Sequence, residues 1–341
     1  LVRGVVTFPA GTVPDYVIVR ANEEPLYTLV NPVDDARMEI THILRGEDLL
    51  SSTPRQIALY RALVDIGVAK RVPVFAHLPL VMGDGNRKLS KRDPQSNLFL
   101  HRDRGFIREG MINYLGTLGW SIADDRDVFD PLEMVLAFDI HAVQPSPARW
   151  DQKKADALNA EHIRRLHPND LASRLLPYLE KAGGLSDNPT LGELGRLKLI
   201  APLIQPRLVV LSDAVPLVAP FYAPDDVVPI ADDARAQLKD NAAQVLDAAL
   251  AALEPIPMNR GDLFSGVGAS WTAATVETEL RKAIIDGLGL KPKDAFGSVR
   301  VAISGQRVSP PLFESIEILG KHSVMKRLAA LRDLLAGGAG S

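Results

Sequence analysis

The chain contains 341 residues, 46% of them hydrophobic and 24% charged, which is typical of a globular protein large enough for two or three domains. The formal net charge of −3 argues against a general affinity for nucleic acid, so phosphate or RNA binding requires local basic patches. The absence of cysteine excludes disulfides and thiolate metal sites and fits a reducing cytoplasm, the location we predict. No run of about 18 apolar residues is present, so we expect no membrane span, and no signal peptide is recognisable.

Three apolar runs in the first hundred residues have the composition of strands. They are residues 15–20 (DYVIVR), 40–44 (ITHIL) and 74–82 (VFAHLPLVM), and Pro79 suggests an end or irregularity in the last one. With a helix between the second and third run, the order predicts a parallel α/β sheet. Ligands of such sheets bind beyond the carboxyl ends of the strands.

Residues 53–66 are predicted to form that helix. Thr53 can cap its N-terminus, Pro54 suits the first helical position, and Gln56 completes a capping box. Gly67 is the expected end of the helix.

A basic loop, GDGNRKLSKRDP at residues 83–94, follows the last predicted strand. Its Lys88 and Lys91 lie three residues apart, and flexible lysines can follow charge that moves during phosphate departure. Taken alone, such a loop is more often an exposed basic turn than a phosphate site.

Beyond about residue 100 the pattern becomes helical, with helices expected at 106–118, 151–165, 169–182, 232–253 and 272–288. The predicted fold class is therefore an α/β portion followed by about 200 residues of helical modules.

Several motifs, in this order, resemble one known family. KLSKR (88–92) is similar to the KMSKS signature of class I aminoacyl-tRNA synthetases, and it follows LRGED (44–48) and TPRQ (53–56) and precedes NYLGTLGW (113–120). Together they resemble bacterial-type glutamyl-tRNA synthetases, from residue 1 to about residue 335.

The resemblance implies a domain order. Residues 1–100 would be the C-terminal half of a Rossmann-like catalytic domain, and 101–165 a helical stem-contact domain. Residues 166–253 and 254–335 would be two helical anticodon-binding domains, and 336–341 a disordered tail. Helical anticodon domains distinguish this family from glutaminyl-tRNA synthetases, whose anticodon-binding part is mainly β-barrel.

The resemblance also implies a reaction, in which ATP activates L-glutamate to glutamyl-adenylate and the glutamyl group passes to the 3′ end of tRNA-Glu. Mg²⁺ would accompany ATP, and no metal site made of protein ligands alone is expected. The implied catalytic residues of the loop are Lys88, Ser90, Lys91 and Arg92. Asp48 and the backbone of Val81 would contact ATP together with Lys91.

The implied glutamate-binding residues are Tyr27, Asn31 and Arg45. Tyr27 and Asn31 share one face of a predicted helix, and Arg45 can grip a carboxylate with its fork of donors. The alternative for Tyr27 is a core aromatic, and the alternative for Arg45 is a structural ion pair with Glu47 or Asp48.

Four other polar residues receive structural interpretations. Asp34 and Asp35 are interpreted as structural rather than metal-binding, and His42 and His77 as buried, hydrogen-bonded histidines.

Anticodon contacts are implied for Arg207, Arg300, Leu312 and Phe313. An arginine suits a base edge and an aromatic ring can stack on a base. The alternative for Leu312 and Phe313 is ordinary packing between helices.

One family feature is missing, the HIGH signature near the N-terminus that holds ATP phosphates. We therefore expect the chain to be part of a longer enzyme whose partners are tRNA-Glu, glutamate and ATP, and the family expectation is a monomer. The isolated 341 residues are expected to be inactive. Alternatives are a catalytically incomplete tRNA-binding protein and a non-discriminating enzyme that also charges tRNA-Gln.

Glu39 stands where the family pattern commonly has glycine.

Overall fold

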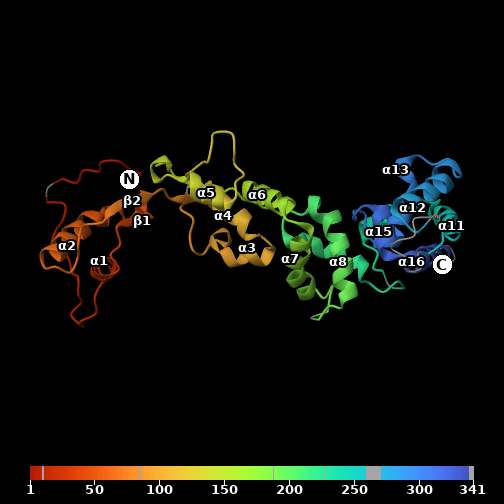
Figure 1. Ribbon diagram of the computed structural model, residues 1–341, viewed down its shortest axis with the longest axis horizontal. Helices are drawn as coiled ribbons and strands as arrows, with labels where there is room; N and C mark the ends of the chain where they lie inside the picture. The colour runs from red at the N-terminus through yellow and green to blue at the C-terminus, as the bar shows by residue number, and fades with distance from the viewer. Residues whose placement is uncertain are drawn as a thin grey trace. The chain divides into compact units, whose positions relative to one another are not determined.

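The computed structural model describes residues 1–9, 11–83, 85, 87–186, 188–226, 228–258 and 270–337. The chain divides into two compact units, Leu1–Glu161 and His162–Ser341, each of which is described by itself (Figure 1). The tail predicted at 336–341 lies outside the described residues from residue 338 onward.

A pair of parallel strands with a helix between them begins the first unit, as the sequence predicts. The strands are joined in register from His42 opposite Val74 to Gly46 opposite Leu78. Tyr60 and Leu63 of the intervening helix are buried against the sheet, so its apolar face forms the local core. The elements are α1 (Tyr27–Arg37), β1 (His42–Gly46), a 3-10 helix (Glu47–Ser52), α2 (Thr53–Asp65) and β2 (Val74–Leu78).

Two local predictions differ from the structure. Residues 15–20 form no strand, and their described backbone makes a single bridge between Val19 and Pro25. The strand expected at 40–44 begins two residues later. The strand expected at 74–82 has the irregularity that Pro79 suggests. It is interrupted at Pro79 and Leu80, because proline has no N–H to offer a ladder, and it resumes as β3 (Val81–Met82).

The capping box predicted at the start of α2 is also wrong. Ser52 occupies the N-cap position and its side chain makes no capping hydrogen bond. The Thr53 and Gln56 side chains instead accept hydrogen bonds from an arginine on β1.

The rest of the first unit surrounds a second short parallel pair, β3 with β4 (Ala148–Arg149). Trp120, Phe129 and Val143 form a small core here. The helices are α3 (Leu98–Arg104), α4 (Arg108–Gly116), α5 (Pro131–Ala137) and α6 (Gln152–Arg165), with 3-10 turns at Pro94–Ser96 and Ile140–Ala142.

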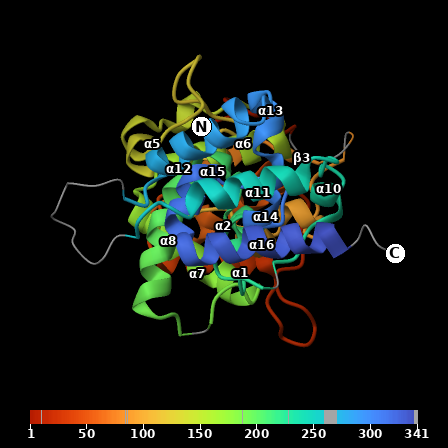
Figure 2. The same cartoon turned by 90° about the vertical axis from the view of Figure 1, so that its right-hand side faces the viewer.

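The regular elements of the second unit are all helices in its described residues, which confirms the predicted order of an α/β part followed by helical modules. α11 and α16 pack together in its core, where they face the viewer in Figure 2. The α-helices are α7 (Pro168–Lys181), α8 (Leu191–Ile204), α9 (Ala214–Val218), α10 (Asp232–Arg235), α11 (Ala242–Leu253), α12 (Ala273–Leu280), α13 (Pro292–Ala295), α14 (Gly297–Ser304), α15 (Leu312–Leu319) and α16 (Lys321–Gly337).

Two predicted helices of this unit are more irregular than expected. The helix expected at 232–253 is divided into α10 and α11, and the helix expected at 272–288 continues from α12 as a π-helix over Arg281–Asp286.

Within the described part of the chain, no single helix is long and apolar enough to cross a membrane. The segments Leu191–Arg207 and Leu211–Phe221 pass that test only as a pair, by length and composition, and a bend of 115° separates them.

Candidate functional site

Arg45 lies at the carboxyl end of β1, and its guanidinium is held by four neutral acceptors. Nη1 donates to Gln56 Oε1 at 2.5 Å, and Nη2 donates to Thr53 Oγ1 at 2.8 Å and to the Leu49 carbonyl at 3.3 Å. Nε donates to His77 Nε2 at 3.3 Å, and the Phe75 ring lies 5.3 Å from the guanidinium carbon. Acceptors on both α2 and β2 therefore hold the Arg45 guanidinium in one orientation.

The acids that follow Arg45 in the sequence bind other partners. Glu47 forms an ion pair with Arg3, and Asp48 accepts a hydrogen bond from Lys88 Nζ at 2.6 Å. Within the residues that the structure describes, Arg45 forms no ion pair, so the alternative of a structural pair with Glu47 or Asp48 is wrong.

Helix α1 supplies the neighbouring polar groups. Asn31 Nδ2 donates to Asp35 Oδ2 at 3.2 Å, and the Tyr60 hydroxyl donates to the same oxygen at 3.0 Å. Burial, and then this hydrogen bond to Asp35, raise the pKa of Tyr60, so its hydroxyl remains a donor at neutral pH. Tyr27 is 55% exposed, so the alternative of a core aromatic does not describe it.

The ionisation of Arg45 reflects its surroundings. Burial lowers its pKa, while the Tyr27 hydroxyl and the Tyr60 and Asp35 side chains act in the opposite direction. Tyr27, Asp35 and Arg45 therefore lie close enough to interact, and Asn31 joins them through Asp35.

His77 is 4% exposed and its Nε2 also lies 2.9 Å from Thr53 Oγ1. Burial, and then the charge of Arg45, lower the pKa of His77, so the ring stays neutral and can accept from Arg45. The expectation of a buried, hydrogen-bonded histidine is confirmed for His77. It is wrong for His42, which is exposed and contacts the Thr41 hydroxyl at 2.9 Å.

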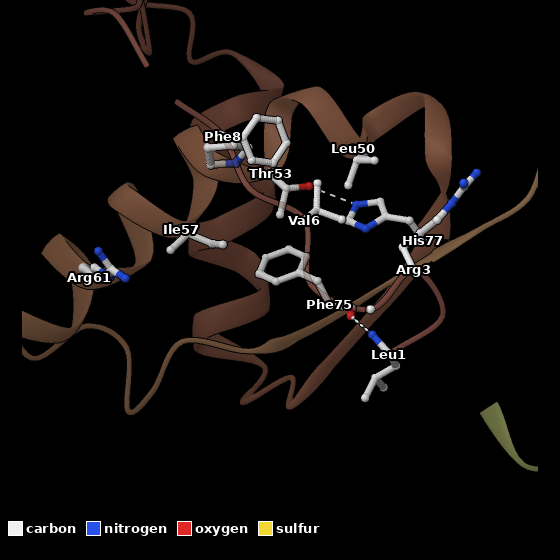
Figure 3. Close-up of a pocket in the computed structure, with 12 residues that line it drawn as sticks. Leu1, Arg3, Val6, Phe8, Leu50, Thr53, Ile57, Arg61, Phe75 and His77 are labelled. Atoms are coloured by element: carbon white, nitrogen blue, oxygen red, sulfur yellow. Dashed lines mark hydrogen bonds between the residues drawn. The ribbon is translucent and has the colours of Figure 1, made fainter. Parts of the chain in front are cut away.

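The Thr53–His77 contact also forms part of the wall of a cavity of about 370 Å³ (Figure 3). Apolar side chains of Leu50, Ile57 and Phe75 line it from the 3-10 helix, α2 and β2, and Val6 and Phe8 line it from the N-terminal segment.

The basic loop is a turn closed by backbone hydrogen bonds. Leu89 N–H donates to the Val81 carbonyl at 2.8 Å, and Gly83 N–H donates to the Arg87 carbonyl at 2.9 Å. Gly85 adopts a left-handed φ of 68°, a conformation that glycine reaches without strain. Asp84 and Asn86 lie outside the described residues.

The signature pentad continues from this turn. Lys88 bridges to Met82 and is directed to Asp48, whereas Lys91 and Arg92 are exposed. The Ser90 hydroxyl accepts from Arg92 N–H at 3.2 Å, and Ser90 N–H donates to Asp93 at 2.7 Å. Ser90 thus shapes the loop. Lys88 contacts Asp48 through its ammonium group and Met82, the neighbour of Val81, through its backbone.

Arg149, which the sequence analysis missed, holds the opening of this loop. Its guanidinium donates to the Gly85 carbonyl at 2.5 Å and to the Gly83 carbonyl at 3.4 Å. β4 brings it there by pairing Met82 with Arg149. No local pattern marks this residue, because its partners lie more than 60 positions away.

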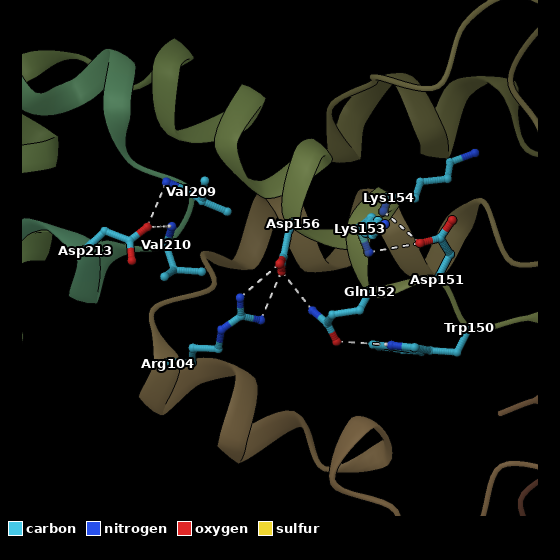
Figure 4. Close-up of polar contacts among 10 residues, drawn as sticks. All are labelled: Arg104, Trp150, Asp151, Gln152, Lys153, Lys154, Asp156, Val209, Val210 and Asp213. Carbon is cyan, nitrogen blue, oxygen red and sulfur yellow. Dashed lines mark hydrogen bonds and ion pairs between the residues drawn. The ribbon is translucent and has the colours of Figure 1, made fainter. Parts of the chain in front are cut away.

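The segment after Arg149 is fixed by polar contacts with α6 (Figure 4). Trp150 Nε1 donates to Gln152 at 3.2 Å, and Gln152 donates to Asp156 at 2.8 Å. Arg104 grips both oxygens of Asp156, at 3.0 and 2.9 Å, so α3 and the start of α6 are tied together.

In the second unit, two of the predicted anticodon residues converge on one loop. Arg207 donates to the Ser309 carbonyl, and Arg300 donates to Ser309 Oγ at 2.6 Å and to the Pro310 carbonyl at 3.2 Å. Burial, and then the charge of Arg207, lower the pKa of Arg300.

The other two predicted anticodon residues follow that loop. Leu312 is only 5% exposed, so it packs in the helical core. Phe313 is half-buried and meets the Phe296 ring edge-on at a centroid distance of 5.3 Å.

No group of three or more histidine, aspartate or glutamate side chains arranged to hold a metal ion is found in the described ranges. Asp34 is exposed and Asp35 accepts the two hydrogen bonds from Asn31 and Tyr60.

Comparison with known families assigns both parts of the chain. Residues 1–157 match the family described as tRNA synthetases class I (E and Q), catalytic domain, and residues 170–332 match the anticodon binding domain family. Similar curated proteins are the glutamate–tRNA ligases of Kocuria rhizophila (58% identical) and Kineococcus radiotolerans (56% identical). Each match covers 98% of this chain and 64% of the relative, so the chain spans just under two thirds of their length.

A solved structure shares the fold. The crystal structure of a glutamate tRNA ligase from Elizabethkingia meningosepticum matches with a TM-score of 0.79 at 23% identity, over 98% of this chain and 65% of that one.

Proposed function

This chain belongs to the family of class I tRNA synthetases for glutamate and glutamine, and from that premise we propose that it is part of a glutamate–tRNA ligase. The proposed reaction is the ATP-dependent activation of L-glutamate to glutamyl-adenylate, followed by transfer to the 3′ end of tRNA-Glu. The common name of its relatives favours this enzyme over a tRNA-binding protein without activity.

The observation that carries the proposal is the state of Arg45. Its guanidinium is fixed by neutral acceptors, and the nearby Glu47 and Asp48 are bound to other cations. A preoriented arginine without a carboxylate partner is suited to bind the carboxylate of a substrate in a bidentate manner. Tyr27 and Asn31 line the same region and complete the proposed glutamate site.

ATP would bind beside this site, where Lys88, Asp48 and Val81 lie together. Lys88 and Lys91 would stabilise the negative charge that gathers on the leaving pyrophosphate, while Ser90 and Arg92 shape the loop. Mg²⁺ would arrive with ATP and share the phosphate charge. The rate depends chiefly on positioning, since the glutamate carboxylate must attack the α-phosphate in line with the leaving group.

The helical unit would read the anticodon of tRNA-Glu. Arg207 and Arg300 both bind the Ser309–Pro310 segment. Either arginine can hold that loop in place, or it can release the loop carbonyl and donate to the edge of a base instead. The half-buried Phe313 ring can stack on a base, and Leu312 supports its backbone from the core.

We further propose a four-part division of the chain, with boundaries near residues 100, 165 and 253, within the two observed units. A monomer in the cytoplasm is proposed for the protein of natural length.

The test is glutamate-dependent exchange between ATP and pyrophosphate, measured with the protein at its natural length and with tRNA-Glu present, followed by charging of tRNA-Glu and tRNA-Gln. We expect exchange with glutamate, little with glutamine or aspartate, and charging of tRNA-Glu. Purified protein that binds tRNA-Glu but supports no glutamate-dependent exchange would contradict the proposal. The 341-residue chain alone is predicted to show no exchange.

A further inference from the structure

Gln56 is 1% exposed and lies in the first turn of α2, directly behind Arg45. Its Oε1 accepts the shortest of the Arg45 hydrogen bonds, at 2.5 Å. Among the side chains that the structure describes, Gln56 Nε2 is the one buried nitrogen or oxygen that lacks a hydrogen-bond partner.

The amide orientation explains why this partnerless donor is tolerated. Arginine offers only donors, so the group facing Nη1 must be an acceptor. Turning the amide over would place the Nε2 donor against the Nη1 donor of Arg45 and would move Oε1 away from the guanidinium. The observed orientation avoids this, but it leaves one buried donor unsatisfied, which itself costs stability. The side chain at position 56 is therefore held for its oxygen, toward Arg45.

The acceptors of Arg45 share one further property, which is the absence of charge. They are an amide, a hydroxyl, a carbonyl and a neutral imidazole. Such groups fix the direction of a guanidinium without neutralising it. A carboxylate in the same position would also accept the hydrogen bond, but it would cancel the positive charge that an incoming anion meets.

We propose that Gln56 is a positioning residue that determines substrate charge preference, because it holds Arg45 through a neutral acceptor and so preserves the preference for an anionic amino-acid side chain over its neutral amide counterpart. The inference rests on the proposed function and deepens it, since it names the group that maintains the selectivity of the Arg45 site.

The matched test variants are Gln56→Glu and Gln56→Met, which keep the length of the side chain. The carboxylate that Gln56→Glu introduces would be ionised beside the arginine and would pair with it. For Gln56→Glu we expect the KM for glutamate to rise by at least about thirtyfold, since like charges brought together cost several kcal/mol. The ratio of kcat/KM for glutamate over glutamine in pyrophosphate exchange should fall by a similar factor, while the KM for ATP stays within about twofold of its wild-type value.

Gln56→Met tests the loss of the acceptor without a change of charge. Methionine removes one acceptor and adds no negative charge beside Arg45, so we expect the KM for glutamate to rise by roughly tenfold, about one charged hydrogen bond, with the preference over glutamine retained. Thr53→Asp places a carboxylate at a second acceptor of Arg45 and should reproduce the loss of preference, should Gln56→Glu not fold.

Gln237→Glu, an exposed position in the helical unit, is the control for the same change in total charge and should leave every constant unchanged. Circular dichroism and thermal melting establish that each variant is folded.

The inference is overturned if both acidic variants fold and keep the wild-type preference for glutamate, or if Gln56→Met loses that preference as fully as Gln56→Glu does. Wild-type protein without glutamate-dependent exchange would overturn the proposed function itself, which separates the two failures.

Discussion

Lys88 Nζ donates a hydrogen bond to Asp48 Oδ2 at 2.6 Å, which joins a predicted catalytic residue to a predicted ATP-binding residue 40 positions away. Both side chains are about half exposed, at 52% and 48%, so the pair lies in a high dielectric and contributes little to stability. The hydrogen bond from Lys88 also lowers the pKa of Asp48, which keeps it ionised at neutral pH. Lys88 can therefore exchange this carboxylate for a phosphate at small cost.

Lys91→Ala is predicted to slow adenylate formation by about a hundredfold or more, because it removes a cation that would stabilise the charge on the leaving phosphates. Lys91 is exposed, so thermal stability should not change. Single-turnover formation of glutamyl-adenylate in the protein of natural length is the measurement. Lys70→Ala, which removes another exposed lysine, serves as the control. A fall of less than about threefold would remove Lys91 from the proposed mechanism.

Arg149→Met is predicted to loosen the signature loop, because the Gly83 and Gly85 carbonyls lose their charged donor. Hydrogen exchange of the Gly83 and Leu89 amides, which close the turn, should accelerate by roughly tenfold, and adenylate formation should slow by a similar factor. Arg149→Lys should recover part of both effects, since it keeps one donor. Unchanged loop exchange in Arg149→Met would show that the loop is held by other contacts.

Arg327→Met is predicted to destabilise the helical unit by about 3–5 kcal/mol, because it leaves Asp225 without its buried partner. The Arg327 side chain is 1% exposed and also donates to the carbonyls of Pro220, Ala223 and Ile303. Urea unfolding followed by circular dichroism measures the change. Arg332→Met on the same helix is the matched control, and its partly exposed ion pairs should make it much milder.

Acidification is predicted to destabilise the first unit through His77. Burial and Arg45 lower its pKa below the ordinary value of 6.5, so the unfolded chain takes up a proton before the folded chain does. The free energy of unfolding therefore falls as pH drops below about 6.5, and this contribution levels off below the folded pKa. Urea titrations between about pH 7.5 and about pH 5.5 should show a weaker pH dependence in His77→Asn than in the wild type. Equal slopes in the two proteins would refute the assignment.

Glu39→Gly is predicted to leave thermal stability unchanged or raised, although it removes the ion pair with Lys70. Glu39 adopts a left-handed φ of 56°, where glycine is unstrained and other residues are not. This conformation gives a physical reason for the glycine common at this position of the family pattern. Glu39→Val should lower the melting temperature clearly, because a branched side chain fits that φ worst. Equal melting temperatures for the glycine and valine variants would contradict this account.

The sequence predicted the strand–helix–strand order of the first unit because those elements follow local patterns. Apolar runs, a proline at the second position of α2 and the glycine after it are read from neighbouring residues. The irregularity at Pro79 is equally local, since it follows from the missing N–H. The same reasoning wrongly predicted a strand at residues 15–20, because a segment of β-favouring residues forms a strand only where a partner strand is available.

The pattern of residue types along this sequence was enough to predict the fold class, and the order of its motifs indicated the family through their resemblance to known sequences. The tertiary structure alone decided what the polar residues bind. Thr53 and Gln56 have the spacing of a helix cap, yet they hold Arg45, because folding brings the carboxyl end of β1 to the start of α2 and a half-buried guanidinium requires acceptors. Arg149 reaches the signature loop for the same reason, through the pairing of β3 with β4. Hydrogen-bond partners depend on which segments become neighbours in space, and no local pattern contains that information.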